Sequence, residues 1–476
     1  MTNNSLNYFV GWMPVDDGRL DSEYYWPSYR QFNELLLSQP HRFIRDVATM
    51  RRPQYRTTET LLPGTKKGTV KFLSPTDVEN FQVDWNSVPE VSESIWDEYP
   101  SGRATPGDLL LEVKGEAKKV FKIGEDVPAK TMVSGSFQQI HIKNPTEAAF
   151  VFATLLSTVW TTQRSRLQSN INIKYVDKAA LNSAILPWPD PLIRHAIASK
   201  VLAAECIRLN ARRLCELAQD KLSNLLGTLD RAHLRPNLDG SCDHFSAFVS
   251  PDKLKLFAGA QFYGPKRKSA IDLVMRSGPS QRIGSIGGRV RSKAKRSLRI
   301  AHIDPSNVVS GDGYWFSAED EDGGDVALAE PLDVLFLRMR PYLNKTTLND
   351  SRTRVSTSPE YLIYRFTQGP DDPYYSALCL RQPWALAQVA EIATGDRPRV
   401  DGEFVDDILI PWPHENTRGE IGRLYKLTFA LRRRADELLK QSIQDIEDLI
   451  RNALDRTNCI EVGRSLIDEF KLELVK

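Results

Sequence analysis

Cysteine is scarce in this sequence and follows no motif. The 476 residues include five cysteines, and none lies in a Cys-x-x-Cys pair. This usage is typical of a reducing cytosol and argues against a disulfide-linked secreted protein. Cys242 and His244 lie close together in the chain, but no second pair of ligands accompanies them. We therefore expect neither a disulfide framework nor a zinc site.

Long apolar runs and targeting signals are missing as well. No segment approaches the roughly 18 continuous apolar residues that a membrane-spanning helix needs. The first five residues have neither the basic nor the apolar region of a signal peptide. The sequence thus predicts a cytoplasmic protein that has no membrane partner.

Motifs for catalysis are absent or incomplete. No Gly-x-Gly-x-x-Gly loop follows a predicted strand, and no Ser/His/Asp or Cys/His set has a recognisable spacing. The nearest match to an adenine methyltransferase motif, Asp371-Asp372-Pro373-Tyr374, lacks the second proline. Asp108, Glu112 and Lys114 have a nuclease-like order, but both carboxylates would face one side of a single strand, with little room to hold a metal. We expect no catalysis, metal or cofactor on this chain.

The charges of the chain nearly cancel. There are 63 lysines and arginines against 61 aspartates and glutamates, which gives a formal net charge of +2. Overall basicity therefore supplies no argument for a nucleic-acid partner, and any such argument has to come from local clusters of charge.

The clearest positive feature is a long internal repeat. Ile185-Leu186-Pro187-Trp188-Pro189 returns as Leu409-Ile410-Pro411-Trp412-Pro413, at an offset of 224 residues. Further matches occur in the same order toward the N-terminus, at offsets that rise to 238: Trp160 with Trp384, residues 106–110 with 331–335, residues 72–78 with 302–308, and residues 25–27 with 263–265. A period above 200 residues is too long for a solenoid repeat. The pattern predicts two tandem domains of one fold, with longer loops in the first.

Each predicted domain is mixed α/β and ends in a long helix. Short β-like runs between Pro and Gly turns occupy residues 1 to about 187 and 236 to about 410. Apolar residues then recur at steps of three and four over about 190–231 and 417–456. Helices of roughly 40 residues would be about 60 Å long, more than one compact domain covers.

The economical arrangement is that the two helices pair with each other. We expect an antiparallel coiled coil, while packing of each helix on its own domain is the alternative. The predicted interface positions are Val201, Leu222, Leu424, Leu431 and Leu438.

This organisation resembles the specificity subunit of type I restriction-modification systems, which has two α/β domains, each closed by a long helix after a Pro-x-Pro. Local motifs agree. Residues 19–25 resemble the family's opening helix, residues 332–341 its strand with an acidic start and a basic end, and residues 393–400 its Thr-Gly turn. Both helix starts depart from the family pattern, and residues 168–172 replace the Thr-Gly turn in the first copy. The chain therefore resembles a divergent member.

The resemblance implies a protein without catalysis that reads a split DNA target, one half-site per domain. It implies two methyltransferase subunits docked on the helical regions, with S-adenosylmethionine bound to those partners rather than to this chain. Restriction or other defence subunits are further partners that it allows. The target-recognition domains would be residues 1–187 and 236–410, with a helix and linker at 188–235 and a C-terminal helix and tail at 411–476.

Basic residues are the predicted contacts to the DNA phosphates. Between positions 266 and 299 eleven basic residues stand with one acidic residue, Asp272, and such a run neutralises phosphates and releases counterions. A solvated charged face is the alternative for any single residue. The predicted phosphate-binding residues are Lys114, Lys118, Lys119, Arg289, Arg291, Lys293, Lys295 and Arg296.

Arginines near strand ends are better suited to reading bases. A guanidinium donates twice to guanine in the major groove, and an asparagine side chain pairs in a similar way with adenine. Side chains of either type at loop tips can also be merely solvated, and the sequence does not choose among them. The predicted base-reading residues are Arg338, Arg340, Lys345, Arg397, Arg399, Asn170 and Asn172.

Two other classes of function remain open. One is a nuclease or another effector of a phage-defence system that carries such domains. The other is an assembly scaffold whose domains have lost base reading. Metal-dependent cleavage by the purified chain would favour the first, and failure to bind DNA in the presence of a methyltransferase would favour the second.

Overall fold

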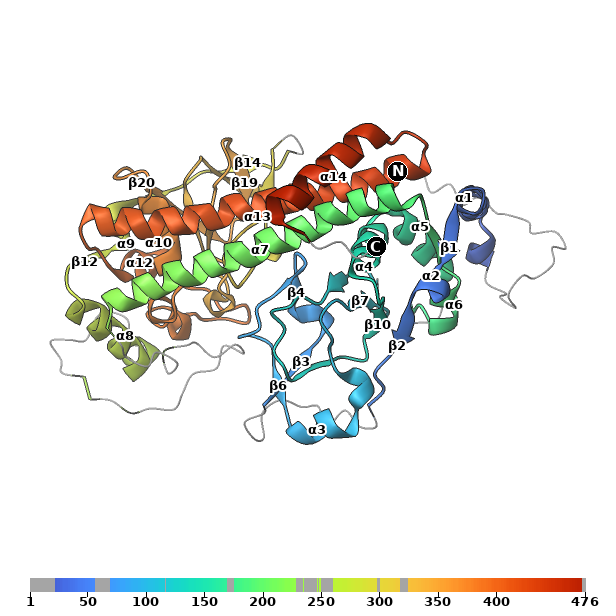
Figure 1. Ribbon diagram of the computed structural model, residues 1–476. Helices are drawn as coiled ribbons and strands as arrows, with labels where there is room; N and C mark the ends of the chain where they lie inside the picture. The colour runs from blue at the N-terminus through green and yellow to red at the C-terminus, as the bar shows by residue number, and fades with distance from the viewer. Residues whose placement is uncertain are drawn as a thin grey trace. The chain divides into compact units, whose positions relative to one another are not determined.

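The structure is a computed structural model that describes residues 22–55, 69–115, 117–168, 175–227, 260–297, 300–316 and 324–472, together with residues 234, 246, 248 and 249. The chain forms two compact units. The first comprises residues 1–206 and 435–476, and the second comprises residues 207–434. Both units contain helices and sheets, so the prediction of a mixed α/β protein is confirmed (Figure 1).

The first unit contains a four-stranded sheet of order β2-β10-β7-β8, a three-stranded sheet β6-β3-β9, and the strand pairs β1-β11 and β4-β5. The strands are β1 (His41–Phe43), β2 (Thr49–Arg51), β3 (Val70–Leu73), β4 (Val78–Glu79), β5 (Gln82–Val83), β6 (Glu90–Val91), β7 (Leu109–Glu112), β8 (Val120–Lys122), β9 (Thr131–Val133), β10 (Phe137–His141) and β11 (Ile185–Pro187). The helices are α1 (Pro27–Leu37), α2 (Ile44–Val47), α3 (Glu93–Glu98), α4 (Pro145–Leu156), α5 (Thr158–Leu167) and α6 (Lys178–Asn182), with short 3-10 helices η2 (Ser22–Tyr25), η4 (Pro75–Asp77) and η5 (Pro100–Gly102).

The second unit contains a four-stranded sheet of order β13-β20-β17-β18, a sheet β14-β16-β19-β15, and the strand pair β12-β21. The strands are β12 (Ser280–Arg282), β13 (Gly287–Val290), β14 (Ala294–Lys295), β15 (His302–Ile303), β16 (Asp325–Ala329), β17 (Val334–Leu337), β18 (Thr347–Leu348), β19 (Val355–Thr357), β20 (Tyr361–Phe366) and β21 (Leu409–Pro411). The helices are α8 (Pro265–Arg276), α9 (Ile283–Ile286), α10 (Asp372–Leu380), α11 (Pro383–Leu386) and α12 (Gly402–Asp406), with 3-10 helices η8 (Ala260–Tyr263), η9 (Pro305–Asn307), η10 (Pro341–Leu343) and η11 (Ala390–Ile392).

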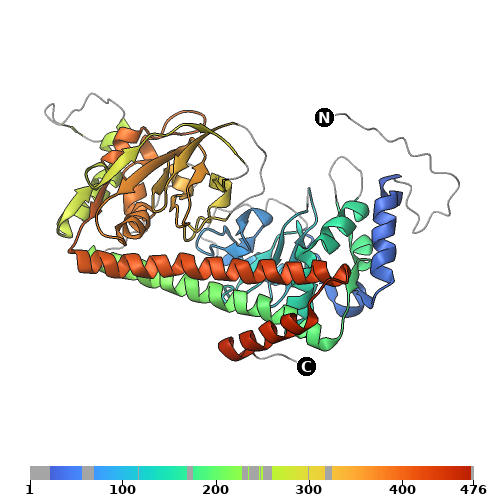
Figure 2. The ribbon, with the colours of Figure 1, turned by 90° about the horizontal axis from the view of Figure 1, so that it is seen from above.

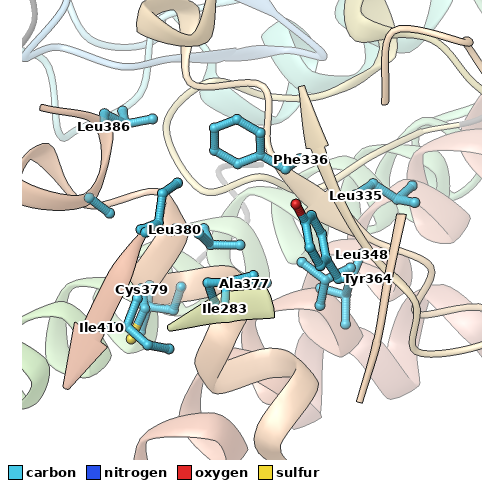
Figure 3. Packing of buried hydrophobic residues seen from close by; sticks show 14 of the residues in the cluster. Ile283, Leu335, Phe336, Leu348, Tyr364, Ala377, Cys379, Leu380, Leu386 and Ile410 are labelled. Carbon is cyan, nitrogen blue, oxygen red and sulfur yellow. The ribbon is translucent and has the colours of Figure 1, made fainter. Parts of the chain in front are cut away.

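Buried aromatic and aliphatic side chains fill the core of each unit. In the second unit, Figure 3 shows Phe336 and Tyr364 from the sheet together with Leu380 from α10, and all three are fully or almost fully buried. Trp160 in the first unit and Trp384 in the second are among the largest fully buried side chains. The two tryptophans that anchor the sequence repeat are therefore core residues.

Two long helices, α7 (Pro191–Leu225) and α13 (Glu415–Ile450), each contribute to both units. Inside the first unit, Val201 of α7 belongs to the same apolar cluster as Leu439 and Ile446 of α13. There the Lys200 Nζ atom lies 2.5 Å from Asp445 Oδ2 across the two helices. Both views show the helices side by side within each unit (Figures 1 and 2).

Inside the second unit, the other parts of the same helices pack on the core. Leu222 of α7 is fully buried and shares a cluster with Tyr425 of α13. The Lys221 Nζ atom lies 2.7 Å from Glu420 Oε1. Of the five predicted interface positions, three are buried and two are only half-buried: Val201, Leu222 and Leu438 in the first group, and Leu424 and Leu431 in the second.

The C-terminal segment contains a further helix, α14 (Arg456–Phe470), which the sequence analysis treated as a tail. Asp455 caps the start of this helix, because its side chain accepts a hydrogen bond from the backbone N–H of Asn458. A Cβ atom at Gly463 would lie 2.7 Å from the Cα atom of Ala196 in α7. Gly463 therefore permits an approach of α14 to α7 that no larger residue would allow.

Candidate nucleic-acid interface

One end of the four-stranded sheet in the second unit gathers basic residues from separate parts of the chain. Strands β13 and β17 are antiparallel to β20 on its two sides, with Val290 opposite Ile363 and Leu337 opposite Tyr361. Because β20 begins at Tyr361, the chain leaves both β13 and β17 at the same end of the sheet. We call this end, with residues 291–295, 338–340, 360 and 394–399, the basic end.

The turn that contains Arg397 joins the basic end through its backbone. Met339 and Arg399 form an isolated β-bridge, and the backbone N–H of Arg340 donates to the carbonyl of Pro398 at 2.6 Å. The backbone N–H of Val400 donates to the carbonyl of Arg338 at 3.0 Å. The strand-end arginines 338 and 340 are thus brought next to arginines 397 and 399, about sixty residues away in sequence.

Glu360 holds two of these arginines. Its carboxylate accepts hydrogen bonds from Nε and Nη2 of Arg399, the shortest at 2.6 Å, and from Nε of Arg338 at 3.3 Å. The hydrogen bond from Arg399 keeps the pKa of Glu360 below its ordinary value, and the same bond raises the pKa of Arg399. The carboxylate is therefore ionised, and the cluster of Glu360 with its two arginines keeps one net positive charge.

Other basic side chains at this end are not held in this way. Arg291, Lys293, Arg340 and Arg397 are exposed, and none of them forms an ion pair with another residue that the structure describes. One acidic residue of the turn, Asp396, is exposed beside them. The free guanidinium and ammonium groups outnumber it, so this surface suits an anion such as the DNA backbone.

The remaining predicted phosphate-binding residues of the second unit are partly engaged by the protein. The Lys295 Nζ atom lies 2.6 Å from Asp325 Oδ1, with both side chains exposed. The Arg289 Nη1 atom lies 3.5 Å from Asp406 Oδ2. Arg296 is half-buried. An exposed pair such as Lys295 with Asp325 is weak and exchanges readily for another anion, whereas the half-buried Arg289 is less accessible.

Lys119 and Lys345, predicted to contact DNA, donate hydrogen bonds to backbone carbonyls instead. In the first unit, the Lys119 ammonium donates to Val78 O at 3.1 Å and to Pro75 O at 2.5 Å. In the second unit, the Lys345 ammonium donates to Val308 O at 2.6 Å. Both lysines therefore fix the turn that follows a 3-10 helix, and their roles in DNA binding stay predictions that this geometry does not favour.

The first unit has a comparable sheet end. Strand β7 ends at Glu112 opposite Phe137, where β10 begins. Just beyond, exposed Lys114 forms a β-bridge with Tyr175. The guanidinium of Arg52 stacks 4.8 Å from the centre of the Tyr175 ring and donates to the Tyr175 hydroxyl group. Lys118 is exposed nearby in the chain, while the predicted adenine readers Asn170 and Asn172 lie outside the described residues.

Two residues at these sheet ends were missed by the sequence analysis. Glu360 was overlooked because an acidic residue before a strand carries no motif, and Arg52 because it stands outside every basic cluster. Arg352 and Arg354, which also lie near strand ends, are on the loop between β18 and β19 at the opposite end of the sheet, where Arg354 Nε bonds Glu330 Oε1 at 2.6 Å.

The carboxylates considered for a nuclease site are used within the sheet. Asp108 is fully buried and accepts hydrogen bonds from Arg51 at 3.0 Å and from His141 at 2.7 Å. Glu112 accepts from the backbone N–H of Lys119 at 3.1 Å. Among the residues that the structure describes, no group of three or more His, Cys, Asp or Glu side chains is arranged to hold a metal ion. No helix in the described part of the chain is long and apolar enough to cross a membrane.

Solved structures from type I restriction-modification systems resemble this chain. The S subunit of a type I restriction-modification system from M. genitalium has 11% sequence identity and a TM-score of 0.35, with coverage of 89% of this chain and 95% of that chain. The HsdS subunit from Thermoanaerobacter tengcongensis has 14% identity and a TM-score of 0.26, with coverage of 90% and 95%. A structure that concerns complex assembly and conformational transition of the type I restriction-modification system has 15% identity and a TM-score of 0.29, with coverage of 87% and 98%.

These structures belong to the same class of protein that the sequence motifs resemble. Neither the family models nor the curated proteins compared with the sequence match it. Because the identities and TM-scores are low, we base the functional proposal on contacts within this chain.

Proposed function

We propose that this chain is a DNA-sequence specificity subunit, which reads a bipartite duplex target and directs a partner methyltransferase to it without catalysis of its own. The observation that carries the proposal is the basic end of the second unit, where exposed basic side chains from three separate segments meet. A surface that reads DNA makes two kinds of contact with the duplex. Contacts to phosphates supply affinity, and contacts to base edges supply the choice of sequence.

The roles follow from the side chains. Arg291 and Lys293, with Lys295 released from its exposed pair, would bind phosphates. Arg338, Arg340 and Arg397 stand where the strand end meets the turn, and we assign base reading to these three. Arg399 lies beside them but is held by Glu360. In the first unit, Lys114 and Arg52 with Tyr175 would face the second half-site.

We further propose that the two units are copies of one fold. The order β2-β10-β7-β8 has the same connections and pairing directions as β13-β20-β17-β18. The parallel pair β3-β9 corresponds to β15-β19. In each unit, the strand just before the long helix pairs with the first strand of that unit: β11 pairs with β1, and β21 pairs with β12.

Single contacts at the helix starts support the duplication. The Arg194 guanidinium lies 4.7 Å from the centre of the Trp188 ring, and the Arg418 guanidinium lies 4.2 Å from that of Trp412. Each arginine also donates to the carbonyl of the proline after its tryptophan, at 2.6 and 2.7 Å. The two Pro-Trp-Pro motifs therefore have the same local structure.

Two buried glutamine side chains, one in each unit, also support the duplication. The side chain of Gln163 donates to the carbonyl of Ile185 and accepts from its N–H, at 2.8 and 2.7 Å. The side chain of Gln388 makes the same two bonds with Leu409, both at 2.9 Å. Each amide thus replaces a missing strand neighbour at the start of the last strand, β11 or β21.

Pairing of the long helices as an antiparallel coiled coil is part of this proposal. Lys200 contacts Asp445, and Lys221, further along α7, contacts Glu420, nearer the start of α13. In antiparallel helices, residues with higher numbers in one helix contact residues with lower numbers in the other, as these two ion pairs do. The paired helices would act as a spacer that fixes the distance between the two half-sites.

The remaining parts of the proposal concern domains and partners. Residues 1–187 and 236–410 would be the target-recognition domains, with a helix and linker at 188–235 and a C-terminal helical segment at 411–476. Two methyltransferase subunits, which carry the S-adenosylmethionine, would dock on the helices, with restriction or other defence subunits as further cytoplasmic partners. Exposed Leu217 of α7 and Leu427 of α13 offer apolar side chains to such a partner.

An assembly scaffold is the second candidate. The observation in its favour is that Arg289, Lys295 and Lys119 are engaged within the protein, as a domain that no longer reads DNA would allow. The free arginines of the basic end favour the reading function instead.

Enrichment of DNA from a random-sequence duplex library by the full chain tests the proposal. We expect the bound fraction to share sequence motifs, and the Arg340→Ala and Arg397→Ala double variant to lose part of one motif while it remains folded. Binding without any enriched sequence, over the whole range of salt, would favour the scaffold. Cleavage of the library in the presence of Mg²⁺ would instead favour an effector nuclease.

A further inference from the structure

The arginines of the basic end differ in how many of their N–H groups the protein already uses. Arg399 donates from Nε and Nη2 to Glu360 and from Nη1 to the carbonyl of Arg397 at 3.4 Å. All three of its side-chain nitrogens therefore donate hydrogen bonds within the protein. Arg399 is a clamp between the turn and Glu360, with little left to offer a base.

Arg338 is held in a different way. Its backbone N–H donates to the carbonyl of Glu360 at 3.1 Å, and its own carbonyl accepts from Val400, so the main chain is fixed on both sides. In the side chain, Nε donates to Glu360 at 3.3 Å, while Nη1 and Nη2 form no hydrogen bond with any described residue. The side chain is 36% exposed. Nη1 and Nη2, the open edge of the guanidinium, thus remain available to a ligand. The hydrogen bond from Nε to Glu360 fixes the direction in which this edge points.

Glu360 itself has no capacity left to read a base. Its side chain is only 19% exposed, and both of its oxygens accept from arginine. A cytosine amino group would have to displace one of these charge-assisted bonds. The carboxylate therefore acts through Arg338 rather than on DNA.

We propose that Glu360 is a positioning residue that aims the open edge of Arg338 at one guanine in the major groove. The two terminal nitrogens of a guanidinium match the O6 and N7 acceptors of guanine, which no other base presents together. A guanidinium whose Nε is already fixed loses less side-chain freedom when it binds. This inference rests on the proposed function. It adds Arg338 as the residue that sets specificity, Glu360 as the residue that positions it, and guanine as the base that is read.

The test uses the full chain and a duplex enriched from the random library. Each guanine of that duplex is replaced in turn by 7-deazaguanine, which lacks the N7 acceptor, and affinity is measured by fluorescence anisotropy. For the unmodified protein, we expect one guanine at which the replacement weakens binding by about tenfold. In Arg338→Lys and in Glu360→Gln this penalty should disappear at that guanine alone. Affinity for a scrambled duplex should not fall in either variant, because neither substitution removes a positive charge.

Glu330→Gln is the matched control, because it removes the pair between Glu330 and Arg354 at the opposite end of the same sheet. It should keep the full penalty at every guanine. Thermal unfolding of all three variants shows whether each is folded, and if Glu360→Gln is not, Arg338→Lys carries the test because it leaves the bond between Glu360 and Arg399 intact.

The outcomes separate this inference from the proposed function. If the chain enriches a sequence but Glu360→Gln and Arg338→Lys keep every guanine penalty, Arg338 reads no guanine and the inference is wrong while the function stands. Loss of all penalties together in folded Glu360→Gln would give Glu360 a general structural role and also overturn the inference. If no sequence is enriched by the unmodified chain, the proposed function fails first.

Discussion

Basic side chains at the end of the second unit's sheet fall into two groups, according to whether a carboxylate holds them. Arg338 and Arg399 are bound to Glu360, whereas Arg291 and Lys293 are exposed and form no ion pair within the described chain. Glu360 gives the guanidinium of Arg338 a defined direction, which favours base reading. Arg291 and Lys293 follow β13 rather than β17, which meets the turn, and would bind the phosphates of any sequence, which gives affinity without specificity.

The free group gives the first prediction. The double variant Arg291→Ala and Lys293→Ala should bind specific and scrambled duplexes more weakly by the same factor. It should also reduce the slope of log affinity against log salt by about 2, because each phosphate contact contributes a slope of about 0.9. Anisotropy titrations over a salt series measure both effects. Lys295→Ala should reduce the slope by less, because its ammonium must first leave Asp325 before it binds a phosphate. An unchanged slope in the double variant would identify these residues as a solvated face.

The held group gives a prediction about pH. Arg399 keeps the pKa of Glu360 below its ordinary value of 4.5, so the folded protein binds this proton less readily than the unfolded chain. The stabilisation is fully present above the ordinary pKa and is lost as pH falls through the lower pKa of the folded state. The difference in unfolding free energy between the natural protein and Glu360→Gln should therefore be constant near neutral pH and vanish in acid. A difference that grows toward acid pH would contradict this sign.

At the scale of elements, the long helices are held by an apolar stripe whose positions differ in burial. Leu222 of α7 is fully buried with Tyr425 and Phe429 of α13 in the core cluster of the second unit. Leu217, five residues earlier on the same helix, is 44% exposed. Helical periodicity therefore separates a packing position from a solvent position within one and a half turns.

This difference predicts the outcome of a matched pair of substitutions. Leu222→Asp should lower the free energy of unfolding by roughly 3–5 kcal/mol, because it places an unpaired carboxylate in an apolar core. Leu217→Asp should change it by less than about 0.5 kcal/mol, as for other exposed positions. Urea unfolding followed by circular dichroism measures both. Equal effects of the two variants would show that this face of α7 is not packed as the structure has it.

At the scale of the whole molecule, features with a local cause were predictable from the sequence. The Pro-Trp-Pro motifs lie just before α7 and α13, where they end the preceding strand. The backbone N–H of each tryptophan continues the strand pairing, to the carbonyl of Pro40 or Pro279, and the proline that follows has no N–H with which to extend it. Trp160 and Trp384 are buried as repeat anchors should be. Arg338 was recognised because it follows an apolar strand pattern, and Arg397 because it lies in the segment that resembles the family's Thr-Gly turn.

Features that depend on contacts distant in sequence were not predictable. Glu360 meets Arg338 and Arg399 across 22 and 39 residues, through a strand register that the sequence does not specify. Lys119 reaches the Val78 carbonyl across 41 residues in the same way. Helix α14 was missed because the break between it and α13 lies in a short polar segment whose composition also suits a tail.

The central claim is that one chain reads two half-sites at a fixed separation. The direct measurement is the affinity of the full chain for its enriched duplex before and after about five base pairs, half a helical turn, are inserted between the two motifs. Because the insertion turns one half-site to the other side of the duplex, we predict that affinity falls to that of a duplex with a single motif. Unchanged affinity, or enrichment of one continuous motif only, would contradict the account.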